Sequence, residues 1–367
     1  MDHLIPWLTL KGVPGVGNLL FKRLVDRFTS PARILATSPG ELVAVDGVTD
    51  RLARTIGARQ PDDDVFRKLD RLAQTPFEIV VLTGTDYPHL LREIPDPPPI
   101  LYVYGRLTHS APHIAVVGSR HPTAYGKATA HRLGADLATM GIVVVSGMAL
   151  GIDTAAHEGS LHAGGPTTAV LGSGLDWIYP PENQRLFHRI AEAGAVVSEF
   201  DLDAEPDRYH FPMRNRVISG MSLGTVVVEA TRRSGSLITA RLAADQNREV
   251  FAVPGSVQSF KSAGTHQLIR EGACLVTDAR DIIAELTLPL CPGDRTEAGS
   301  KTNPVALPQD LAPDEAMVLA ALEPYAQHID DLVRILDMDP GSVSALLLKL
   351  ELLGLVRQES GARFSRK

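Results

Sequence analysis

The alternation of apolar runs with helical segments between His113 and Leu286 constrains the fold of this chain more than any other feature. Seven short runs rich in β-branched residues recur there, and about ten to fifteen residues of helical pattern separate most of them. The runs lie near residues 114–118, 142–146, 167–171, 195–199, 225–229, 250–253 and 273–276. This alternation predicts an α/β fold with a doubly wound, mostly parallel sheet, whose outgoing loops all lie at one edge.

Five of these outgoing loops are rich in glycine and serine. They are Gly118-Ser119-Arg120, Ser146-Gly147, Gly172-Ser173-Gly174, Ser234-Gly235-Ser236 and Pro254-Gly255-Ser256. Glycine lets a ligand approach the backbone, serine adds a hydroxyl group, and the start of the following helix carries a partial positive charge. One such loop is ordinary turn chemistry. Five of them at one edge indicate a site for phosphate or another anion.

Charge distinguishes the stretch Arg208–Arg241 from the rest of the chain. It holds six arginines and one acidic residue, Glu229, so it carries +5 in a chain of 367 residues that carries −7. We expect an arginine-rich hairpin at Phe211–Arg216, a buried strand at Thr225–Val228, and the turn Ser234–Ser236 opening a helix. A basic surface on an acidic protein favours a confined anion site. For any single arginine, pairing with a nearby acidic residue is an equally good interpretation.

The sequence offers no arrangement of residues typical of an enzyme. It contains no GxxxxGK[ST] motif, and Gly172–Gly174 lacks the third glycine of a dinucleotide-binding loop. Four acidic residues fall near the loop edge, namely Asp153, Asp176, Glu199 and Glu229. Asp153 fits a helix N-cap, and the other three lie beside arginines or strand ends that would satisfy them. We therefore predict that the protein is not an enzyme.

A metal site and a membrane span are also disfavoured by the sequence. His157 and His162 are five residues apart, whereas zinc-protease chemistry needs two histidines four apart on one helical face. Cys274 and Cys291 have no second cysteine or histidine at ligand spacing. No apolar run is long enough to cross a membrane, and the amino terminus breaks at once with proline and glycine. We predict a cytoplasmic protein without a metal or another cofactor.

Residues 1–75 predict a small helical domain. Two glycine turns, Leu10–Gly17 and Val45–Thr49, each precede an apolar-periodic helix, as in helix-hairpin-helix and SAM-like domains. Such turns can present backbone N–H groups to a DNA phosphate. A compact packing module is the other interpretation, which Asp46 and Asp50 favour because they place negative charge at the second turn.

Residues 76–290 form the predicted main domain. Two further strand-like runs, 78–82 and 100–104, precede the alternating region and add strands or a lid to it. The prolines within 95–99 exclude a helix between these runs. Residues 291–313 combine prolines, glycines and mixed charge without periodicity, which predicts a linker.

Residues 314–367 have the pattern of a winged-helix domain. Three helical runs and a short β-wing follow one another, at 314–322, 328–336, 342–353 and 355–364. The third helix carries one lysine, Lys349, and offers little to phosphates or base edges. The tail 354–367 carries +3, which leaves contacts of the wing with DNA and contacts with a protein both open.

Taken together, the ordered blocks of this chain resemble the DprA (Smf) family of DNA-processing proteins. The blocks are Gly118–Arg120, Ser146–Asp153, Ala169–Asp176 with Tyr179–Asn183, Phe211–Arg216, Val227–Ala230, Ser234–Leu237 with Thr239-Ala240, and Phe251–Gly255. The resemblance implies an extended Rossmann-like fold with a small helical N-terminal domain and a C-terminal winged-helix domain. It also implies a homodimer that binds single-stranded DNA without catalysis and loads the RecA recombinase on it during natural transformation.

The resemblance also implies which residues contact the DNA. The phosphate-binding positions are Gly118, Ser119, Arg120, Ser146, Gly147, Gly172, Arg214, Asn215, Arg216, Ser234 and Ser236, with their neighbours Gly235, Arg232 and Arg233. Among the aromatics near the loop edge, Trp177, Tyr179, Tyr209 and Phe211, we expect Phe211 to stack on a base. Met213 stands where many members of the family have a basic residue, and Leu150 where some have arginine, so two cationic contacts are missing.

Two other classes of function stay open at this point. A nucleotide-processing enzyme on a similar scaffold is one, such as the lysine-decarboxylase-like phosphoribohydrolases, which carry a PGGxGT turn and a helix glutamate. The equivalent turn here, Arg233–Leu237, has neither the double glycine nor that glutamate. A structural protein that binds only other proteins is the second, and salt-sensitive binding of single strands would argue against it.

Overall fold

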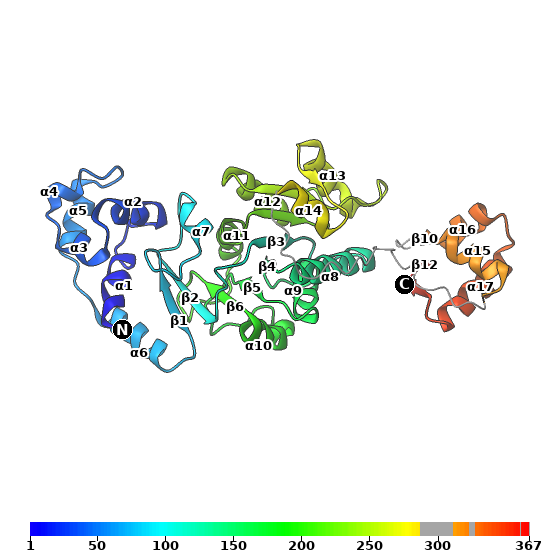
Figure 1. Ribbon diagram of the computed structural model, residues 1–367, viewed down its shortest axis with the longest axis horizontal. Coiled ribbons are helices and arrows are strands. Elements are labelled where there is room, and N and C mark those ends of the chain that lie inside the picture. Colours follow the sequence, from blue (N-terminus) through cyan, green and yellow to red (C-terminus); the bar gives the residue numbers. More distant parts are fainter. Residues whose placement is uncertain (287–310, 323–326, 360, 367) are drawn as a thin grey trace. The chain divides into compact units, whose positions relative to one another are not determined.

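The computed structural model describes residues 1–286, 311–322, 327–359 and 361–366 (Figure 1). Its internal contacts divide the chain into two compact units. The first comprises Met1–His121 and Thr129–Leu290, and we call it the α/β unit. The second comprises Pro122–Ala128 and Cys291–Lys367, and we call it the winged-helix unit. The predicted linker 291–313 lies almost entirely outside the described residues.

The first 75 residues are helical, as predicted. The helices are η1 (Asp2–Leu4), α1 (Ile5–Lys11), α2 (Asn18–Phe28), α3 (Pro31–Ala36), α4 (Pro39–Leu42), α5 (Asp50–Gly57) and α6 (Asp63–Ala73). Thr49 and Asp62 cap α5 and α6, because each side chain accepts a hydrogen bond from an N–H of the first turn. Both predicted turns contain a glycine with positive φ, Gly15 at 94° and Gly47 at 92°, where other residues would be strained.

A nine-stranded sheet follows, and all seven predicted strands belong to it. The strands are β1 (Glu78–Val81), β2 (Ile100–Gly105), β3 (His113–Val117), β4 (Val143–Ser146), β5 (Thr167–Val170), β6 (Ala195–Ser198), β7 (Gly224–Val227), β8 (Glu249–Ala252) and β9 (Cys274–Leu275). Their order is β1-β2-β6-β5-β4-β3-β7-β8-β9. The pairs from β6 to β9 are parallel, whereas β2 pairs antiparallel with β6 and β1 antiparallel with β2. The two early runs therefore extend the sheet and do not form a lid.

The order of the strands reverses at β3, which lies between β4 and β7. Register places Val117 of β3 opposite Val227 of β7, so the two strands end side by side. After β3 the chain continues to β4, toward one edge of the sheet, and after β7 it continues to β8, toward the opposite edge. In open α/β sheets a ligand binds in the crevice at such a point.

Helices cover both faces of this sheet. They are α7 (His89–Glu93), α8 (Ala124–Thr139), α9 (Ile152–His162), α10 (Gln184–Ala193), α11 (His210–Gly220), α12 (Ser236–Asp245), α13 (Ala263–Arg270) and α14 (Ala279–Glu285), with short η2 (Pro181–Asn183) and η3 (Phe260–Ser262). Figure 1 shows α11, α12 and α13 on one side of the strands and α8, α9 and α10 on the other. This is the doubly wound arrangement that the sequence predicts.

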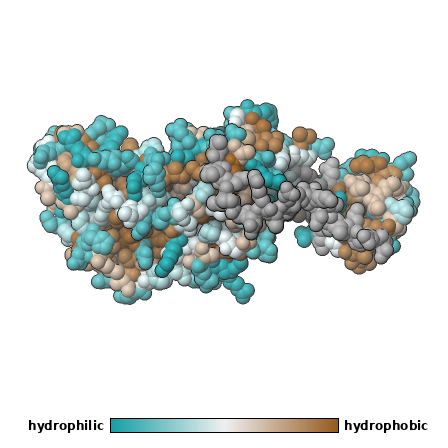
Figure 2. Space-filling model, viewed as in Figure 1, coloured by the Kyte–Doolittle hydropathy of each residue, from teal (hydrophilic) through white to brown (hydrophobic). Residues whose placement is uncertain are grey.

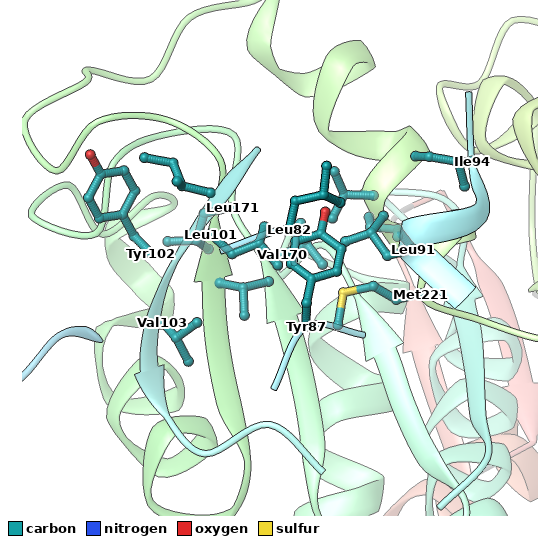
Figure 3. Packing of buried hydrophobic residues seen from close by; sticks show 14 of the residues in the cluster. Leu82, Tyr87, Leu91, Ile94, Leu101, Tyr102, Val103, Val170, Leu171 and Met221 are labelled. Atoms are coloured by element: carbon teal, nitrogen blue, oxygen red, sulfur yellow. The ribbon is translucent and has the colours of Figure 1, made fainter. Parts of the chain in front are cut away.

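In β3, β4, β7 and β8 the period of two places alternate side chains in two separate hydrophobic clusters. In β3, Val117 packs in one cluster with Val217 of α11, while Val116 packs in the other with Leu133 of α8. Figure 3 shows part of the first cluster, where Leu91 of α7 lies near Met221 at the end of α11. The first cluster also includes the buried residues of the N-terminal helices.

The expected hairpin at Phe211–Arg216 is wrong, because His210–Gly220 is helix α11. Pro212 is compatible with this helix because it lies in the first helical turn, where its missing N–H costs no intrahelical hydrogen bond. The helical period therefore sends Arg214 and Arg216 in different directions.

The winged-helix unit has the predicted order of elements. They are α15 (Pro313–Ala321), β10 (Gln327–His328), α16 (Ile329–Leu336), α17 (Pro340–Leu352), β11 (Val356–Glu359) and β12 (Arg363–Arg366). The strands form an antiparallel sheet in the order β10-β12-β11, and Leu332, Leu347 and Phe364 are buried in the unit's own core. Apolar residues also reach the surface of this unit (Figure 2). Among the described residues, no helix is both long and apolar enough to span a bilayer.

Candidate functional site

A cleft of about 760 Å³ opens at the carboxyl ends of β3 and β7, where the strand order reverses. Its walls come from the loop after β3, the start of α9, helix α11, and the turn that leads into α12. The predicted residues among its lining are Gly118, Ser119, Arg120, Phe211, Arg214, Asn215, Ser234, Gly235 and Ser236. The structure thus brings together residues that are more than one hundred positions apart in sequence.

A smaller pocket of about 190 Å³ shares several residues with the cleft, among them Arg120 and Phe211. Its lining adds the predicted glycines Gly147 and Gly172, which follow β4 and β5. The loops after β5, β4, β3 and β7, which are neighbours in the sheet, therefore contribute to one concave surface. This follows from the parallel topology, which places these loops at the same edge.

The glycines of these loops are required by close packing. A Cβ on Gly147 would lie 2.6 Å from Nη2 of Arg214, and one on Gly172 would lie 2.7 Å from Cδ1 of Phe211. A Cβ on Gly118 would lie 2.7 Å from Cγ1 of Ile152. Because atoms cannot approach so closely, any larger residue would displace a wall of the cleft.

Arg214 lies beneath the loops and only 4% of it is exposed. Its Nη1 donates to the carbonyl oxygen of Gly147 at 2.7 Å and also to the carbonyl oxygen of Val170. The guanidinium therefore ties the loop after β4 to the end of β5. Burial lowers the pKa of Arg214 to about 10, although the nearby carboxylate of Asp153 acts in the opposite direction.

Asp153 supplies the balancing charge, and only 7% of it is exposed. Its Oδ2 accepts from the N–H of Gly147 at 3.1 Å and the N–H of Ala149 at 3.4 Å. Burial raises the pKa of this carboxyl, while the charge of Arg214 and the two N–H groups lower it. The predicted N-cap role is wrong, because the N-cap of α9 is Gly151. Asp153 instead fixes the loop after β4 from its own helix.

A cation and two aromatic rings form the exposed side of the cleft. The guanidinium carbon of Arg120 lies 5.3 Å from the ring centroid of Phe211. The ring centroids of Phe211 and Tyr179 are 5.6 Å apart, and Tyr179 is 43% exposed. Arg208 also lines the cleft and lies 4.7 Å from the ring of Tyr209. Cation and ring surfaces of this kind suit a ligand that carries both phosphates and bases.

The turn before α12 closes the other side of the cleft. The hydroxyl oxygens of Ser234 and Ser236 are 2.8 Å apart, and the Ser236 N–H donates to the Ser234 hydroxyl at 3.4 Å. The N-cap of α12 is Gly235, which has no side chain to cap the helix. The positive end of the α12 dipole therefore faces the cleft together with two hydroxyl groups.

Four predicted positions do not line the cleft or the smaller pocket. Ser146 is fully buried and donates to the carbonyl oxygen of Val116 at 2.6 Å, which joins β4 to β3. Arg232 and Arg233 are exposed beside the turn that precedes α12. Arg216 is buried and pairs with Asp96 and Glu199.

Several residues of the cleft were not among the predicted contacts. Tyr179 was considered as an aromatic and not selected, while Arg208 was counted only as part of a basic stretch. Pro206, Thr231 and Ile238 had no signal in the sequence, because their presence in the lining depends on how α11 and α12 pack. Among the described residues, no group of three or more histidine, cysteine or carboxylate side chains could hold a metal ion.

Two family models match this chain. The model of DNA recombination-mediator protein A matches residues 78–287, and the model of the DprA winged helix domain matches residues 302–362. The first match contains the whole sheet and every residue of the cleft.

Curated relatives and solved structures are similar to the chain over most of their lengths. Protein Smf of Synechocystis is 37% identical over 390 residues, which cover 98% of each chain. DNA processing protein DprA of Bacillus subtilis is 43% identical over 60% of this chain and 75% of its own. The structure of DprA from Streptococcus pneumoniae has a TM-score of 0.61 and 35% identity, covering 78% of this chain and 98% of its own.

A structure of DprA from Helicobacter pylori is also similar, with a TM-score of 0.52 and 31% identity. It covers 57% of this chain and 95% of its own, and its description refers to a unique mode of binding single-stranded DNA.

Proposed function

Because this chain belongs to the DNA recombination-mediator protein A family, whose members carry the names DprA and Smf, we propose that its cleft binds single-stranded DNA independently of sequence. A role in DNA processing follows from the family itself. The observation that carries the proposal is the pairing of Arg120 with the ring of Phe211 at the mouth of a glycine-walled cleft.

Phosphates are held, in this proposal, by polar groups that line the cleft. Arg120 is exposed, and Asn215, Ser234 and Ser236 line the same space. The N-terminus of α12 adds a partial positive charge, and the glycine loops let the DNA backbone approach the protein backbone. Arg232 and Arg233 extend the positive charge beyond the cleft, where further phosphates would lie.

A single strand fits this lining better than a duplex does. Phe211 and the half-exposed Tyr179 offer ring faces, and a base can stack on a ring only when it is not already stacked in a duplex. No base edge needs to be read by hydrogen bonds, which makes the binding independent of sequence. The description of the Helicobacter pylori relative supports this preference.

Arg214 has a different role from the one that its position in the motif suggests. Its guanidinium is buried and engages two backbone carbonyls, so it organises the loops that face the DNA. Ser146 and Arg216 are likewise buried, and we propose that they hold the fold of the site.

Further parts of the proposal rest on the family alone. We propose that the protein acts as a homodimer in the cytoplasm, loads the RecA recombinase on the bound strand, and has neither catalytic activity nor a cofactor. The description of the family as recombination mediators supports the recombinase as partner. Stimulation of RecA filament growth on an oligonucleotide would test this part separately from DNA binding.

Titration of a labelled oligonucleotide tests the central claim. The full chain is mixed with the single strand and with its duplex at several salt concentrations. We expect tighter binding of the single strand, with an affinity that falls as salt rises because phosphate contacts release counterions. Equal affinity for duplex, or no binding, would contradict the proposal. In that case hydrolysis of nucleotides becomes the next assay, since a nucleotide-processing enzyme is the alternative.

A further inference from the structure

Arg216 occupies a buried junction between α11 and other parts of the α/β unit. Its side chain is 8% exposed. Its Nε lies 3.2 Å from Oδ2 of Asp96, its Nη1 donates to the Asp96 carbonyl oxygen at 2.7 Å, and its Nη2 donates to Oε2 of Glu199. Gln246, the C-cap of α12, donates to the backbone carbonyl of Arg216 at 3.0 Å. The junction therefore fixes both the side chain and the backbone of α11.

Glu199 connects this junction to the N-terminal helices. It follows β6, and its side chain is 7% exposed. Its Oε2 also accepts from Nδ2 of Asn18 at 3.1 Å, and its backbone carbonyl accepts from Nζ of Lys11 at 3.3 Å. Lys11 ends α1 and Asn18 begins α2, so both flank the first glycine turn.

A second set of contacts joins the same two parts of the unit. Asp201 forms ion pairs with Lys11 and with Lys68 of α6, both at 2.9 Å, and accepts from the Tyr102 hydroxyl at 3.1 Å. The two lysines hold the pKa of Asp201 well below its usual range despite its burial. The N-terminal helices therefore bind two residues that follow β6, Glu199 and Asp201.

Helix α11 is also the element that carries much of the cleft. Phe211, Arg214 and Asn215 lie on the same helix as Arg216 and within five residues of it. A helix moves as a rigid rod over such a distance. A shift of Arg216 would therefore displace the ring, the buried guanidinium and the amide of the cleft together.

We propose that Glu199 and Arg216 are positioning residues for DNA binding, through which the N-terminal helices hold α11 in place and set the affinity of the cleft. The proposal rests on the proposed function of the cleft. It gives the first glycine turn a role other than contact with DNA, because Lys11 and Asn18 beside that turn bind groups of the protein itself.

Glu199→Gln tests the proposal because the two explanations predict opposite changes in the affinity for single-stranded DNA. Removal of a negative charge near a site for a polyanion strengthens binding if charge alone matters. Loss of the buried pair with Arg216 loosens α11 and weakens binding if positioning matters. We expect affinity to fall about three- to thirtyfold. Glu192→Gln, an exposed residue of α10, is the matched control and should bind as the wild type does.

Asn18→Ala tests the part played by the N-terminal helices. It removes the amide that contacts Glu199 and leaves the pair of Glu199 with Arg216 in place. We expect weaker binding of the single strand with an unchanged salt slope, because the phosphate contacts themselves are intact. Thr55→Ala is the control, since the Thr55 hydroxyl donates within α5, to the carbonyl of Arg51 at 2.9 Å.

Hydrogen exchange supplies a readout that needs no DNA. Amides of α11 should exchange faster in Asn18→Ala than in the wild type, while the control Thr55→Ala leaves them unchanged. The proposal is overturned if Glu199→Gln binds as tightly as the wild type or more tightly, or if Asn18→Ala changes neither affinity nor exchange in α11. Failure of the wild type to bind single strands would refute the proposed function, and the exchange data would still decide whether the N-terminal helices hold α11.

Discussion

The cleft of the α/β unit and helix α17 of the winged-helix unit both occupy places where their folds usually bind a ligand, yet their surfaces differ in kind. The cleft combines an exposed arginine, Arg120, with the ring of Phe211, serine hydroxyls and the start of a helix. In α17 the single cation, Lys349, forms an ion pair with Glu315. Leu348 and Leu352 of α17 are 58% and 81% exposed.

This difference shows that a fold provides a place for a ligand, while the residues at that place decide which ligand binds. The third helix of a winged helix usually enters a DNA groove, where cations and hydrogen-bond donors make the contacts. Exposed leucines cannot make such contacts, because phosphates and base edges need polar partners. We therefore propose that the cleft, and not α17, is the surface that binds DNA.

Arg214→Ala should have the largest effect on stability and DNA binding, because it removes the buried guanidinium that joins the loop after β4 to the end of β5. The variant leaves buried Asp153 without its neighbouring counter-charge and removes the hydrogen bonds from Arg214 to two backbone carbonyls. We expect the free energy of unfolding to fall by about 3–5 kcal/mol and binding of single strands to be lost. Denaturant titration and oligonucleotide binding measure the two effects. Arg241→Ala, an exposed residue of α12, should change neither.

Acid should destabilise the α/β unit through buried histidines. Burial lowers the pKa of His157 to about 3 and that of His113 to about 4. Below about pH 6.5 the unfolded chain binds protons that the folded chain does not, so stability present at neutral pH is lost as pH falls. Each histidine contributes a loss of about 1.4 kcal/mol per pH unit between its two pKa values.

Tryptophan fluorescence can follow this transition, because both tryptophans, Trp7 and Trp177, belong to the α/β unit. Urea unfolding at pH 7, 6 and 5 gives the slope of stability against pH. We expect His157→Gln to reduce that slope by the contribution of one histidine, about 1.4 kcal/mol per pH unit. An unchanged slope in the variant would mean that His157 takes up a proton in the folded protein.

Arg120→Ala should weaken binding without affecting stability. Arg120 is exposed and contacts the ring of Phe211, so its loss would remove one proposed phosphate contact and the cation beside the proposed stacking ring. We expect about a tenfold loss of affinity and a salt slope reduced by about one unit. Arg189→Ala, an exposed residue of α10, removes the same charge elsewhere and is the control. Equal losses in both variants would show that net charge, not the cleft, sets the affinity.

Gly172→Ala should have a smaller effect, through displacement of Phe211. The added Cβ would lie 2.7 Å from that ring, which must move away from Gly172. We expect destabilisation by about 1–3 kcal/mol and a loss of affinity of a few-fold. Gly40→Ala is the matched control, because its Cβ would meet nothing within 4 Å. Wild-type affinity in Gly172→Ala would show that the ring does not contact the DNA.

The sequence was sufficient to predict the sheet and the edge at which the cleft lies. Alternating strands and helices determine which loops share an edge, and glycines in those loops mark where atoms approach closely. Gly147 and Gly172 were found in this way, and the structure gives their reason in the contacts with Arg214 and Phe211. The extra strands β1 and β2 were recognised as strands, but their antiparallel pairing depends on contacts distant in sequence.

For the two arginines of α11, the sequence did not predict which groups their side chains contact. Arg214 and Arg216 are the same type of residue and lie two positions apart in the sequence. Both were predicted to contact phosphate. The direction in which each points depends on the helix and on its partners, Asp153 for one and Glu199 for the other. These partners lie 61 and 17 residues away, so no local pattern reveals them.

Lys349→Ala should have the smallest effect, and it probes the other side of the comparison. Lys349 already contacts a carboxylate, and its neighbours on α17 offer no second cation, so its loss removes no phosphate contact. We expect the affinity for single strands to change by less than about twofold, with the same salt slope. A tenfold loss with a smaller slope would instead make α17 a second DNA surface. The exposed leucines would then border a contact with phosphates, and the cleft would not account for DNA binding alone.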